Sequence, residues 1–445
     1  MNRVKWLLVA GAIVSVAAGY GRAAFAAESA PTLEELDQKL RVIERKLEID
    51  AQAAEEKKKA SVSAQAGADG LGIKSADGNF ALKFRGLIQA DSRVYLDDQR
   101  IPLTNTFLLR RVRPILEGTL YKDYDFNFTP DFAGSAISLL DAYIDYHPSQ
   151  SFRVRVGKFK APVGLERLQS ISAALFTELA FPTALAPNRD IGLQVHGDVA
   201  GGILNYAVGL FTGTQDGASN ETDGNDSKDV AGRIFIAPFK NAYSDWARGL
   251  SFGAAGTYGT RNGALASYRT SGQQTFFTYL TTVTAEGTQW RFAPQITYYK
   301  GRFGLIGEYI LSTQEVKHSS ITPTFVSNQA WQIAGSFLLT GDKASFRGVT
   351  PVRPFDPKSG QWGALELAAR YTELIIDDAV VDKGFVNLTN SARRASAWAA
   401  GVNWYLNKAL RVQADYEETA FVNGAARNFD REKEKVVFTR FQVAF

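Results

Sequence analysis

The C-terminal segment of the chain alternates between mostly apolar and mostly polar positions with a period of two. One face of this segment carries Val437, Thr439, Phe441, Val443 and Phe445, and the other carries Phe438, Arg440, Gln442 and Ala444. Such alternation predicts a β-strand with one apolar face. A strand that crosses a bilayer needs an apolar lipid face with aromatic side chains near the interface, so this segment indicates a membrane-spanning strand.

The same pattern recurs from Phe80 to the end of the chain. Strand-like segments begin near residues 80, 107, 124, 137, 152, 190, 201, 229, 250, 288, 302, 329, 361, 394, 409 and 435. Tight connections such as 121–123 and 407–408 alternate with long polar stretches such as 214–228. An even number of strands with short turns at one end and long loops at the other is typical of outer-membrane barrels. We therefore predict an all-β fold, a transmembrane antiparallel β-barrel of about 16 strands over residues 80–445.

A soluble β-sandwich or a propeller would also alternate in this way. Neither fold accounts for the aromatic face unless that face is buried between sheets. The chain also lacks a repeat of fixed period, which a propeller requires.

The N-terminal region differs in kind from the strand-like part. Residues 1–26 combine a basic start, an apolar run and a final Ala-Phe-Ala, which predicts a cleaved signal peptide. Residues 27–79 are predicted to form a periplasmic helix and a linker, with the linker at 61–72. The helix carries an apolar seam with the 3-4 spacing of a short coiled coil, formed by Leu33, Leu36, Leu40, Ile43 and Leu47. A solvated helix that lies against another surface remains the alternative.

The amino-acid composition limits the kinds of functional site that the chain could form. The chain has no cysteine and only three histidines, which lie far apart, so neither disulfides nor a metal site are expected, and no cofactor is indicated. The formal net charge of +4 is too small to identify a partner, and nothing indicates nucleic-acid binding. An enzyme barrel would need a nucleophile, a base and an orienting group, and neither His147 nor His196 has a G-x-S-x-G element beside it.

A barrel of this size leaves an aqueous channel whose selectivity depends on inward-facing charges. If the aromatic face of each strand is taken as the lipid face, the alternate residues of that strand face the lumen. This strand parity places a dense set of cations on the lumen side, including Lys83, Arg85, Arg111, Arg113, Arg153, Arg155 and Arg233. The same parity places Arg110 on the outer face, unless a bulge intervenes. These cations either pair with neighbouring carboxylates and hold the wall together or form an anion-selective track.

The segment 161–188 is too apolar for an exposed loop, so we expect it to fold into the barrel and narrow the pore. Lys158 and Lys160, with the charged residues Glu166, Arg167, Glu178 and Arg189, would then line the constriction. Whether both lysines face inward depends on a bulge at Gly157. The alternative is a loop that packs against another subunit.

Four segments, 77–93, 108–126, 139–146 and 157–170, together resemble the phosphate- and polyphosphate-selective porins, the porin O and P family of Gram-negative outer membranes. The resemblance implies a homotrimer of sixteen-stranded barrels in the lipid bilayer, inserted by the barrel-insertion machinery. It also implies an arginine ladder, onto which Arg85, Arg110 and Arg111 map, and a constriction with Lys158 and Lys160. The absence of lysine from 161–188 departs from the family's lysine-rich loop.

The sequence therefore predicts an outer-membrane channel for passive, anion-preferring diffusion, with phosphate or polyphosphate as the leading solute. A general diffusion porin of the same fold is the alternative. A third hypothesis is an envelope-tethering or adhesion protein whose helix binds a periplasmic partner.

Overall fold

A computed structural model describes residues 32–60, 62–97, 102–223, 226–318 and 323–445, without the side chains of 53–60 and 428. The chain divides into two compact units, Met1–Ser61 and Val62–Phe445, and each is described by itself. The signal peptide predicted for residues 1–26 lies outside the described residues.

The first unit contains one helix, α1 (Leu33–Ala60). Its first turn is closed by a reciprocal capping pair, in which Glu35 N donates to Thr32 Oγ1 and Thr32 N donates to Glu35 Oε2. The predicted apolar seam is exposed along its length, with Leu33 87% and Leu40 57% accessible. The helix prediction is confirmed, and the exposed seam has no apolar partner among the described residues.

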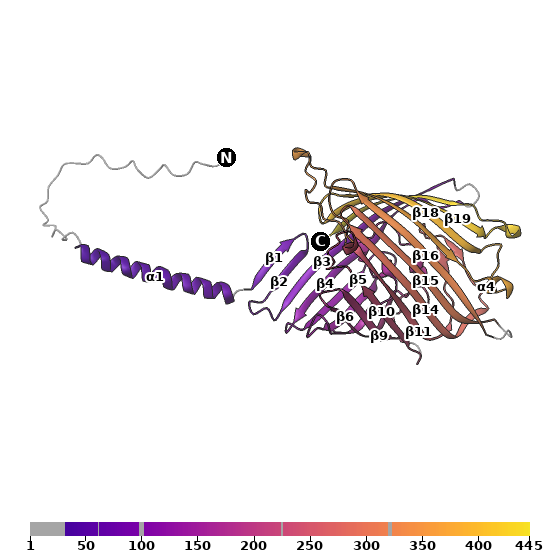
Figure 1. Ribbon diagram of the computed structural model, residues 1–445, viewed down its shortest axis with the longest axis horizontal. Helices are drawn as coiled ribbons and strands as arrows, with labels where there is room; N and C mark the ends of the chain where they lie inside the picture. Colours follow the sequence, from indigo (N-terminus) through magenta and orange to yellow (C-terminus); the bar gives the residue numbers. More distant parts are fainter. Residues whose placement is uncertain (1–31, 61, 98–101, 224–225, 319–322) are drawn as a thin grey trace. The chain divides into compact units, whose positions relative to one another are not determined.

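The second unit is a closed antiparallel barrel of 16 strands (Figure 1). Its strands are β3 (Ala81–Leu96), β4 (Thr106–Leu120), β5 (Tyr124–Asp131), β6 (Ser138–Tyr146), β7 (Arg153–Lys160), β8 (Arg189–Val199), β9 (Leu204–Phe211), β10 (Asp229–Ile236), β11 (Leu250–Gly263), β14 (Val283–Lys300), β15 (Phe303–His318), β16 (Thr324–Leu338), β17 (Ala364–Ile375), β18 (Ala392–Tyr405), β19 (Leu410–Asn423) and β20 (Glu434–Ala444). Every predicted strand start lies within five residues of an observed one. The barrel prediction is confirmed.

Short elements occupy the connections. They are α2 (Leu165–Leu168), η1 (Ile171–Ala173), α3 (Pro182–Leu185), η2 (Ala247–Gly249), β12 (Tyr268–Arg269), β13 (Thr275–Phe277), η3 (Pro357–Ser359), α4 (Asp378–Asp382) and η4 (Ala426–Asn428). No helix in the described part of the chain is both long and apolar enough to cross a membrane.

The barrel closes where β20 pairs with β3, from Lys435↔Leu96 to Ala444↔Leu87. Phe445 continues this seam by exchanging backbone hydrogen bonds with Gly86. The strand β20 ends at Ala444, so the first residues of β3 have no partner from β20. A hairpin of β1 (Ser63–Gly67) and β2 (Gly70–Lys74) takes that place, with β2 paired to β3 from Leu71↔Phe84 to Lys74↔Ala81.

This hairpin corrects the sequence interpretation, which placed a linker at residues 61–72. The strands are rich in Ala, Gly and Ser, so they lack the contrast between apolar and polar positions that reveals the other strands. Their structure depends instead on the open edge of β3 and on a turn with Gly70 at φ 98°. Pairing with a distant segment, rather than local pattern, forms them.

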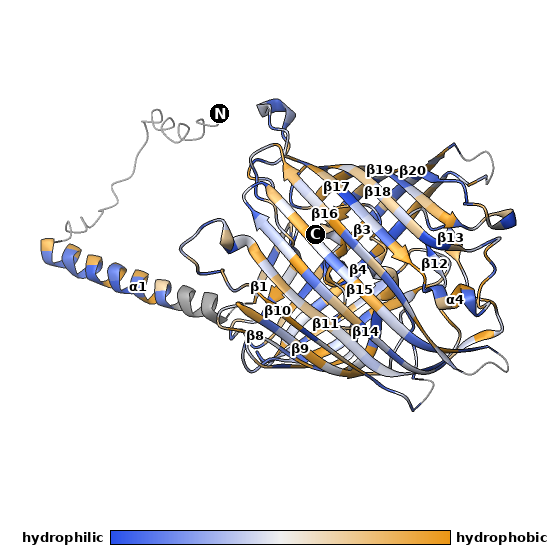
Figure 2. Cartoon of the chain, turned by 45° about the vertical axis from the view of Figure 1, so that its right-hand side comes forward, coloured by the Kyte–Doolittle hydropathy of each residue, from blue (hydrophilic) through white to orange (hydrophobic). Residues whose placement is uncertain are grey.

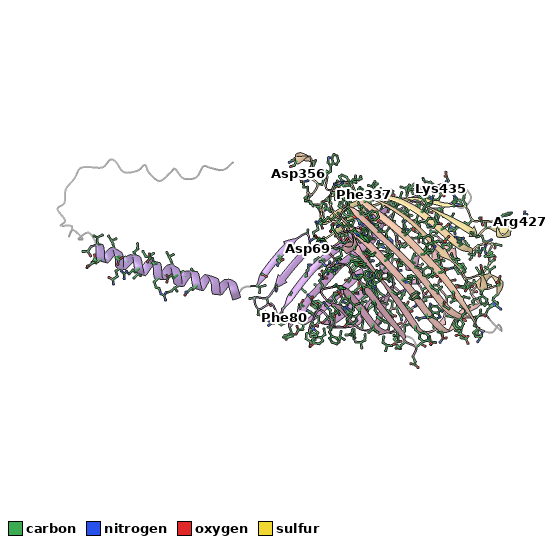
Figure 3. All side chains as sticks on the ribbon, viewed as in Figure 1. Asp69, Phe80, Phe337, Asp356, Arg427 and Lys435 are labelled. Carbon is green, nitrogen blue, oxygen red and sulfur yellow. The ribbon has the colours of Figure 1, made fainter. Side chains whose placement is uncertain are left out.

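Hydrophobic and hydrophilic residues alternate along many of the strands (Figure 2). Apolar residues such as Phe292, Trp398 and Phe441 are exposed on the outer wall, whereas polar residues between them are buried inside. Figure 3 shows Arg427 at one end of the barrel and Asp69 and Phe80 at the other. We call the first the loop end and the second, where the C-terminus lies, the turn end.

One connection at the turn end departs from the predicted alternation of short turns and long loops. The segment 339–363 between β16 and β17 is long although it shares its end with tight turns such as 301–302. Ala344 and Val349 of this segment are buried against Leu338, Ala364 and Tyr405. The segment therefore packs against the barrel at this end instead of forming a simple turn.

Candidate functional site

The loop 161–188 folds into the barrel, as its apolar sequence predicted. Lumen-facing polar residues of the strands β18 and β19 hold its backbone. Asp415 accepts a hydrogen bond from Thr177 N at 2.6 Å, and Arg411 Nη1 donates to Ala174 O at 3.0 Å. Val163 and Leu185 of the loop are fully buried. This lumen wall therefore serves to anchor the loop, which excludes solvent from that side.

Two further segments fill the same side of the lumen. The loop between β11 and β14 places Phe276 and Phe277 in the buried cluster that also contains Phe181. From the turn end, Phe346 O accepts a hydrogen bond from Gln169 Nε2 at 2.8 Å. The larger cavities inside the barrel therefore border the strands β3–β10.

A cavity of about 580 Å³ lies toward the loop end, and we call it the upper chamber. Its cationic lining residues are Arg110, Arg111, Arg113, Lys160, Arg167, Arg189 and Arg269, and its acidic lining residues are Glu166, Glu178 and Asp216. Cations thus outnumber carboxylates in the wall of this chamber, which makes its interior favourable for anions.

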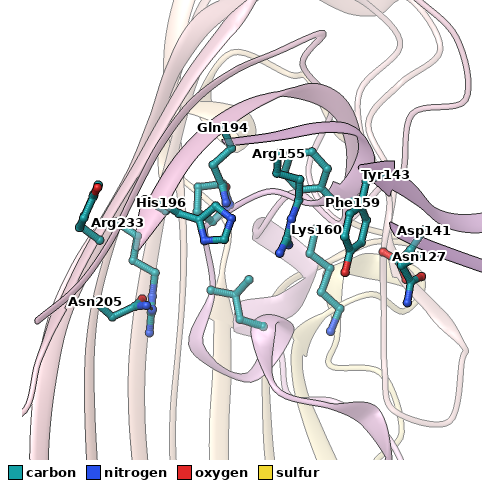
Figure 4. A pocket seen from close by; sticks show the side chains of 14 residues that line it. Asn127, Asp141, Tyr143, Arg155, Phe159, Lys160, Gln194, His196, Asn205 and Arg233 are labelled. Carbon is teal, nitrogen blue, oxygen red and sulfur yellow. The ribbon is translucent and has the colours of Figure 1, made fainter. Parts of the chain in front are cut away.

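Two cavities lie toward the turn end. The β7–β10 chamber, of about 360 Å³, receives the side chains of Arg155, Lys160 and Arg233 (Figure 4). The C-terminal chamber, of about 310 Å³, is lined by Arg85, Arg113, Lys160, Arg189, Lys408, Asp69, Asp141 and Phe445, among others. Lys160 lines all three chambers, so its ammonium group lies where they meet.

Several predicted site residues are neutralised by carboxylates on the barrel wall. The ion pairs are Arg85–Glu117 at 2.8 Å, Lys83–Glu117 at 3.8 Å, Arg113–Asp131 at 2.7 Å, Arg153–Asp125 at 2.9 Å, Arg155–Asp145 at 2.6 Å and Arg189–Asp141 at 3.2 Å. These pairs stabilise the wall and at the same time reduce the positive potential in the lumen.

Arg110 corrects the parity assignment. A register shift in the β3–β4 pairing, between Gln89 and Ala90, leaves Arg110 as an extra residue and turns it inward. Its Nε donates to Glu178 Oε1 at 2.6 Å. Burial alone would raise the pKa of Glu178, but the guanidinium groups of Arg110 and Arg111 hold this pKa at about 2. Glu178 is therefore ionised at neutral pH and also pairs with Arg93 at 3.0 Å.

Four cations donate to uncharged oxygens instead. Lys160 Nζ donates to Gln169 O at 2.9 Å and Arg111 Nη1 to Gln89 Oε1 at 2.6 Å. Arg233 donates to Gln295 and Asn205 side chains, and Arg167 donates to Thr183 O. In the described part of the chain none of these four has a carboxylate within 4.0 Å. These four groups are therefore not neutralised by carboxylates of the barrel wall.

Lys158 is separated from this group. No register shift interrupts the pairing of β7 with β6 or β8, so the bulge considered at Gly157 is absent from these pairings. Lys158 Nζ lies 2.6 Å from Glu221 Oε2 in the loop after β9, and Lys158 lines none of the three chambers. The structure thus brings Lys160, and not Lys158, to the chambers of the lumen.

Sequence reasoning missed two cations that line the chambers. Arg269 of β12 lines the upper chamber, but it comes from a polar loop that has no periodicity to orient its residues. Lys408 lies in a turn, where its ammonium contacts Asp69 Oδ1 at 2.6 Å beside the C-terminal chamber. Pattern analysis gives orientations only within regular strands.

A sixteen-stranded closed barrel with an inward-folded loop and a charged lumen is the architecture of an outer-membrane porin. A family model described as "Phosphate-selective porin O and P" matches residues 80–445. This protein therefore belongs to the phosphate-selective porin O and P family and lies in the outer membrane of a Gram-negative bacterium. Its family and fold are those of channels rather than of enzymes.

Individual relatives agree with this assignment. Porin O of Pseudomonas aeruginosa is 23% identical over 410 residues, which cover 84% of this chain and 91% of that protein. The outer-membrane channel DcaP of Acinetobacter baumannii superimposes with a TM-score of 0.55 at 12% identity, covering 84% of this chain and 99% of the other. The trimer form of OmpT of Vibrio cholerae gives 0.51 at 11% identity, with 82% and 99% covered. These two structures share the fold.

Proposed function

We propose that this porin is an anion-preferring channel for passive diffusion and that phosphate or polyphosphate is its leading solute. The observation that carries the proposal is the position of Lys160. It lines all three chambers, and its ammonium donates to a neutral carbonyl oxygen rather than to a carboxylate. An anion that passes between the chambers would meet this uncompensated charge.

The route begins in the upper chamber, where Arg110 and Arg111 lie. It continues past Arg113, Lys160 and Arg189, of which all three also line the C-terminal chamber. Arginine donates two parallel hydrogen bonds to phosphate oxygens and keeps its charge at any physiological pH. Most of these arginines are already paired with a carboxylate. The sites would therefore bind an anion weakly, and weak binding permits flux through the channel.

A general diffusion porin remains the second candidate. The observation that favours it is the extent of charge pairing, since both Arg113 and Arg189 are neutralised by aspartates. The loop 161–188 also contributes Arg167 but no lysine to the lumen. Under this alternative the channel would pass small solutes with weak charge selectivity and without a preference for phosphate.

We propose further that the protein acts as a homotrimer. A groove of about 530 Å³ on the outer wall is lined mostly by small and apolar residues of β3, β4, β19 and β20, and its lining residue Phe107 is 90% accessible. The exposed seam of α1 offers a second apolar surface for self-association. The trimer form of OmpT supports this assembly by analogy of fold.

Single-channel recording of the trimer in planar bilayers tests the proposed function. We expect an anion-selective reversal potential in a KCl gradient and block of the chloride current by added phosphate. Lys160→Gln should lower the ratio of anion to cation permeability roughly fivefold, the effect of removing about 1 kcal/mol of charge attraction. Lys158→Gln is the matched control and should leave the ratio unchanged.

Weak charge selectivity without block by phosphate would support the general diffusion porin. A strong preference for cations in the unmodified protein would reject both candidates. An effect of Lys158→Gln as large as that of Lys160→Gln would reject the proposed role of Lys160.

A further inference from the structure

The segment 352–362, which we call the rim segment, projects from the barrel at the turn end. Figure 3 shows Asp356 at the tip of this projection, outside the barrel wall. The projection is compact, because the Asp356 carboxylate accepts hydrogen bonds from Lys358 N and Ser359 Oγ, and Asp356 forms a bridge with Gln361. Gly360, at φ 67°, closes the turn. The rim segment is thus an ordered structure rather than a loose connection.

Three aromatic rings attach the rim segment to the outer wall. Phe355 meets Trp404 of β18 edge to face, with ring centroids 5.2 Å apart, and Trp362 lies 6.4 Å from Trp404. Trp404 Nε1 donates to Trp362 O at 2.6 Å. Despite these contacts Trp362 remains 70% accessible and Val352 80% accessible. A large apolar surface is therefore left uncovered at the outside of the barrel.

This surface is continuous with the lipid-facing wall. Trp404 stands beside Leu365 of β17, and the exposed Leu367 and Val402 pair farther along the same two strands. The outward face of these strands must be covered by acyl chains in the membrane. Tryptophan at the end of such an apolar band lies at the headgroup level of a bilayer. The rings of the rim segment extend that band outward from the wall.

Two cations flank the aromatic rings. Arg353 and Lys358 are exposed, and within the described residues neither lies within 4.0 Å of a carboxylate. The one acidic group of the rim segment, Asp356, is engaged by the turn itself. An apolar surface with two available cations at the headgroup level is complementary to an anionic lipid.

We propose that the rim segment binds anionic phospholipid headgroups of the periplasmic leaflet. Its aromatic rings insert at the level of the headgroups, and Arg353 and Lys358 bind the phosphates. The segment thereby fixes how deeply this side of the barrel lies in the bilayer. This interaction is separate from permeation and does not depend on the solute that the pore conducts.

Quenching of tryptophan fluorescence by brominated lipids tests the proposal. The full protein is placed in nanodiscs of phosphatidylcholine that contain a fixed fraction of phosphatidylglycerol or phosphatidylcholine brominated near the headgroup. The signal of Trp362 is the difference between the unmodified protein and Trp362→Phe. We expect brominated phosphatidylglycerol to quench this signal roughly threefold more strongly than brominated phosphatidylcholine.

Charge variants separate headgroup binding from simple insertion. The double variant Arg353→Gln/Lys358→Gln keeps all three rings and should reduce quenching by the two lipids to the same level. Lys383→Gln, an exposed lysine at the loop end, should change nothing. Heat-modifiable gel mobility confirms that each variant is folded. Absence of quenching at Trp362 would place the segment in water or against another protein and would overturn the proposal. Equal quenching by both lipids in the unmodified protein would overturn the headgroup preference.

Discussion

Arg440 and Asp91 face each other across the seam where the last strand of the barrel meets the first. They are register partners of β20 and β3. The guanidinium donates through Nε at 2.7 Å and through Nη2 at 2.6 Å to the two carboxylate oxygens, and both side chains are fully buried. A bidentate pair in this position stabilises the seam that joins the two ends of the sheet.

Asp91→Asn should destabilise the barrel because it leaves the Arg440 charge buried without a counterion. Loss of one partner of a buried pair costs about 3–5 kcal/mol. Urea unfolding in lipid vesicles, followed by tryptophan fluorescence, measures the free energy of unfolding. Asp97→Asn removes the exposed partner of Lys435 on the same seam and should have little effect. Equal effects of the two substitutions would contradict this account.

Glu178→Gln should increase anion preference. The Glu178 carboxylate neutralises both Arg93 and Arg110 beside the upper chamber, so its removal frees their charge. We expect the ratio of anion to cation permeability to rise roughly fivefold, as for one unit of charge near the path. The reversal potential in a salt gradient measures the ratio. Glu221→Gln, in an exposed loop outside the upper chamber, is the control, and an unchanged ratio for Glu178→Gln would place Arg110 off the path.

The difference in ion selectivity between the unmodified protein and Glu178→Gln should depend on pH. Because nearby guanidiniums lower the pKa of Glu178 to about 2, its carboxylate stays ionised when the pH falls from 7 to 4. The difference in selectivity between the unmodified protein and Glu178→Gln should therefore persist at pH 4 and fade only as the pH approaches 2. Reversal potentials of both proteins, recorded between pH 7 and pH 2, test this pH dependence. A difference that disappears between pH 6 and 4 would mean that Glu178 titrates normally.

Gly70→Ala should weaken the β1–β2 hairpin. Gly70 has φ 98°, and an added Cβ would lie 2.2 Å from Phe84 O, so the substitution combines backbone strain with a clash. Strain of this kind costs about 1–3 kcal/mol. Hydrogen exchange of the amides in residues 81–84 should accelerate as β2 leaves the edge of β3. Gly67→Ala, which has no atom within 4 Å of the added Cβ, should leave exchange unchanged.

Leu40→Asp should reduce trimer formation if the seam of α1 associates with copies of itself. A charge at a seam position opposes burial of the apolar surface. Analytical ultracentrifugation in detergent measures the fraction of trimer. Val42→Asp places the same charge at an exposed position outside the seam and should leave the trimer intact. Loss of a periplasmic partner with an unchanged trimer would favour tethering.

The direction in which a side chain points could be predicted from the sequence for residues within regular strands, but not for residues at bulges or in connections. Residues within regular strands, such as Arg85 and Arg155, could be oriented from alternation because neighbours in a strand point to opposite faces. Arg110 could not, because one extra residue in β4 reverses the parity and leaves no trace in composition. Arg269 and Lys408 lie in connections, where no period applies.

The alternation of the chain by itself determined the barrel and its strand number, because apolar residues must face the lipid. The apolar composition of the loop 161–188 determined its inward position, because such a loop must be shielded from water. The tertiary structure alone decided which cations keep their charge. Pairing of Arg113 with Asp131, and the exposure of Lys160 to all three chambers, depend on contacts between strands that local sequence does not encode. The net charge that a solute meets in the lumen depends on the distances between charged groups of different strands. The alternation within one strand shows only which face of the barrel wall a residue occupies.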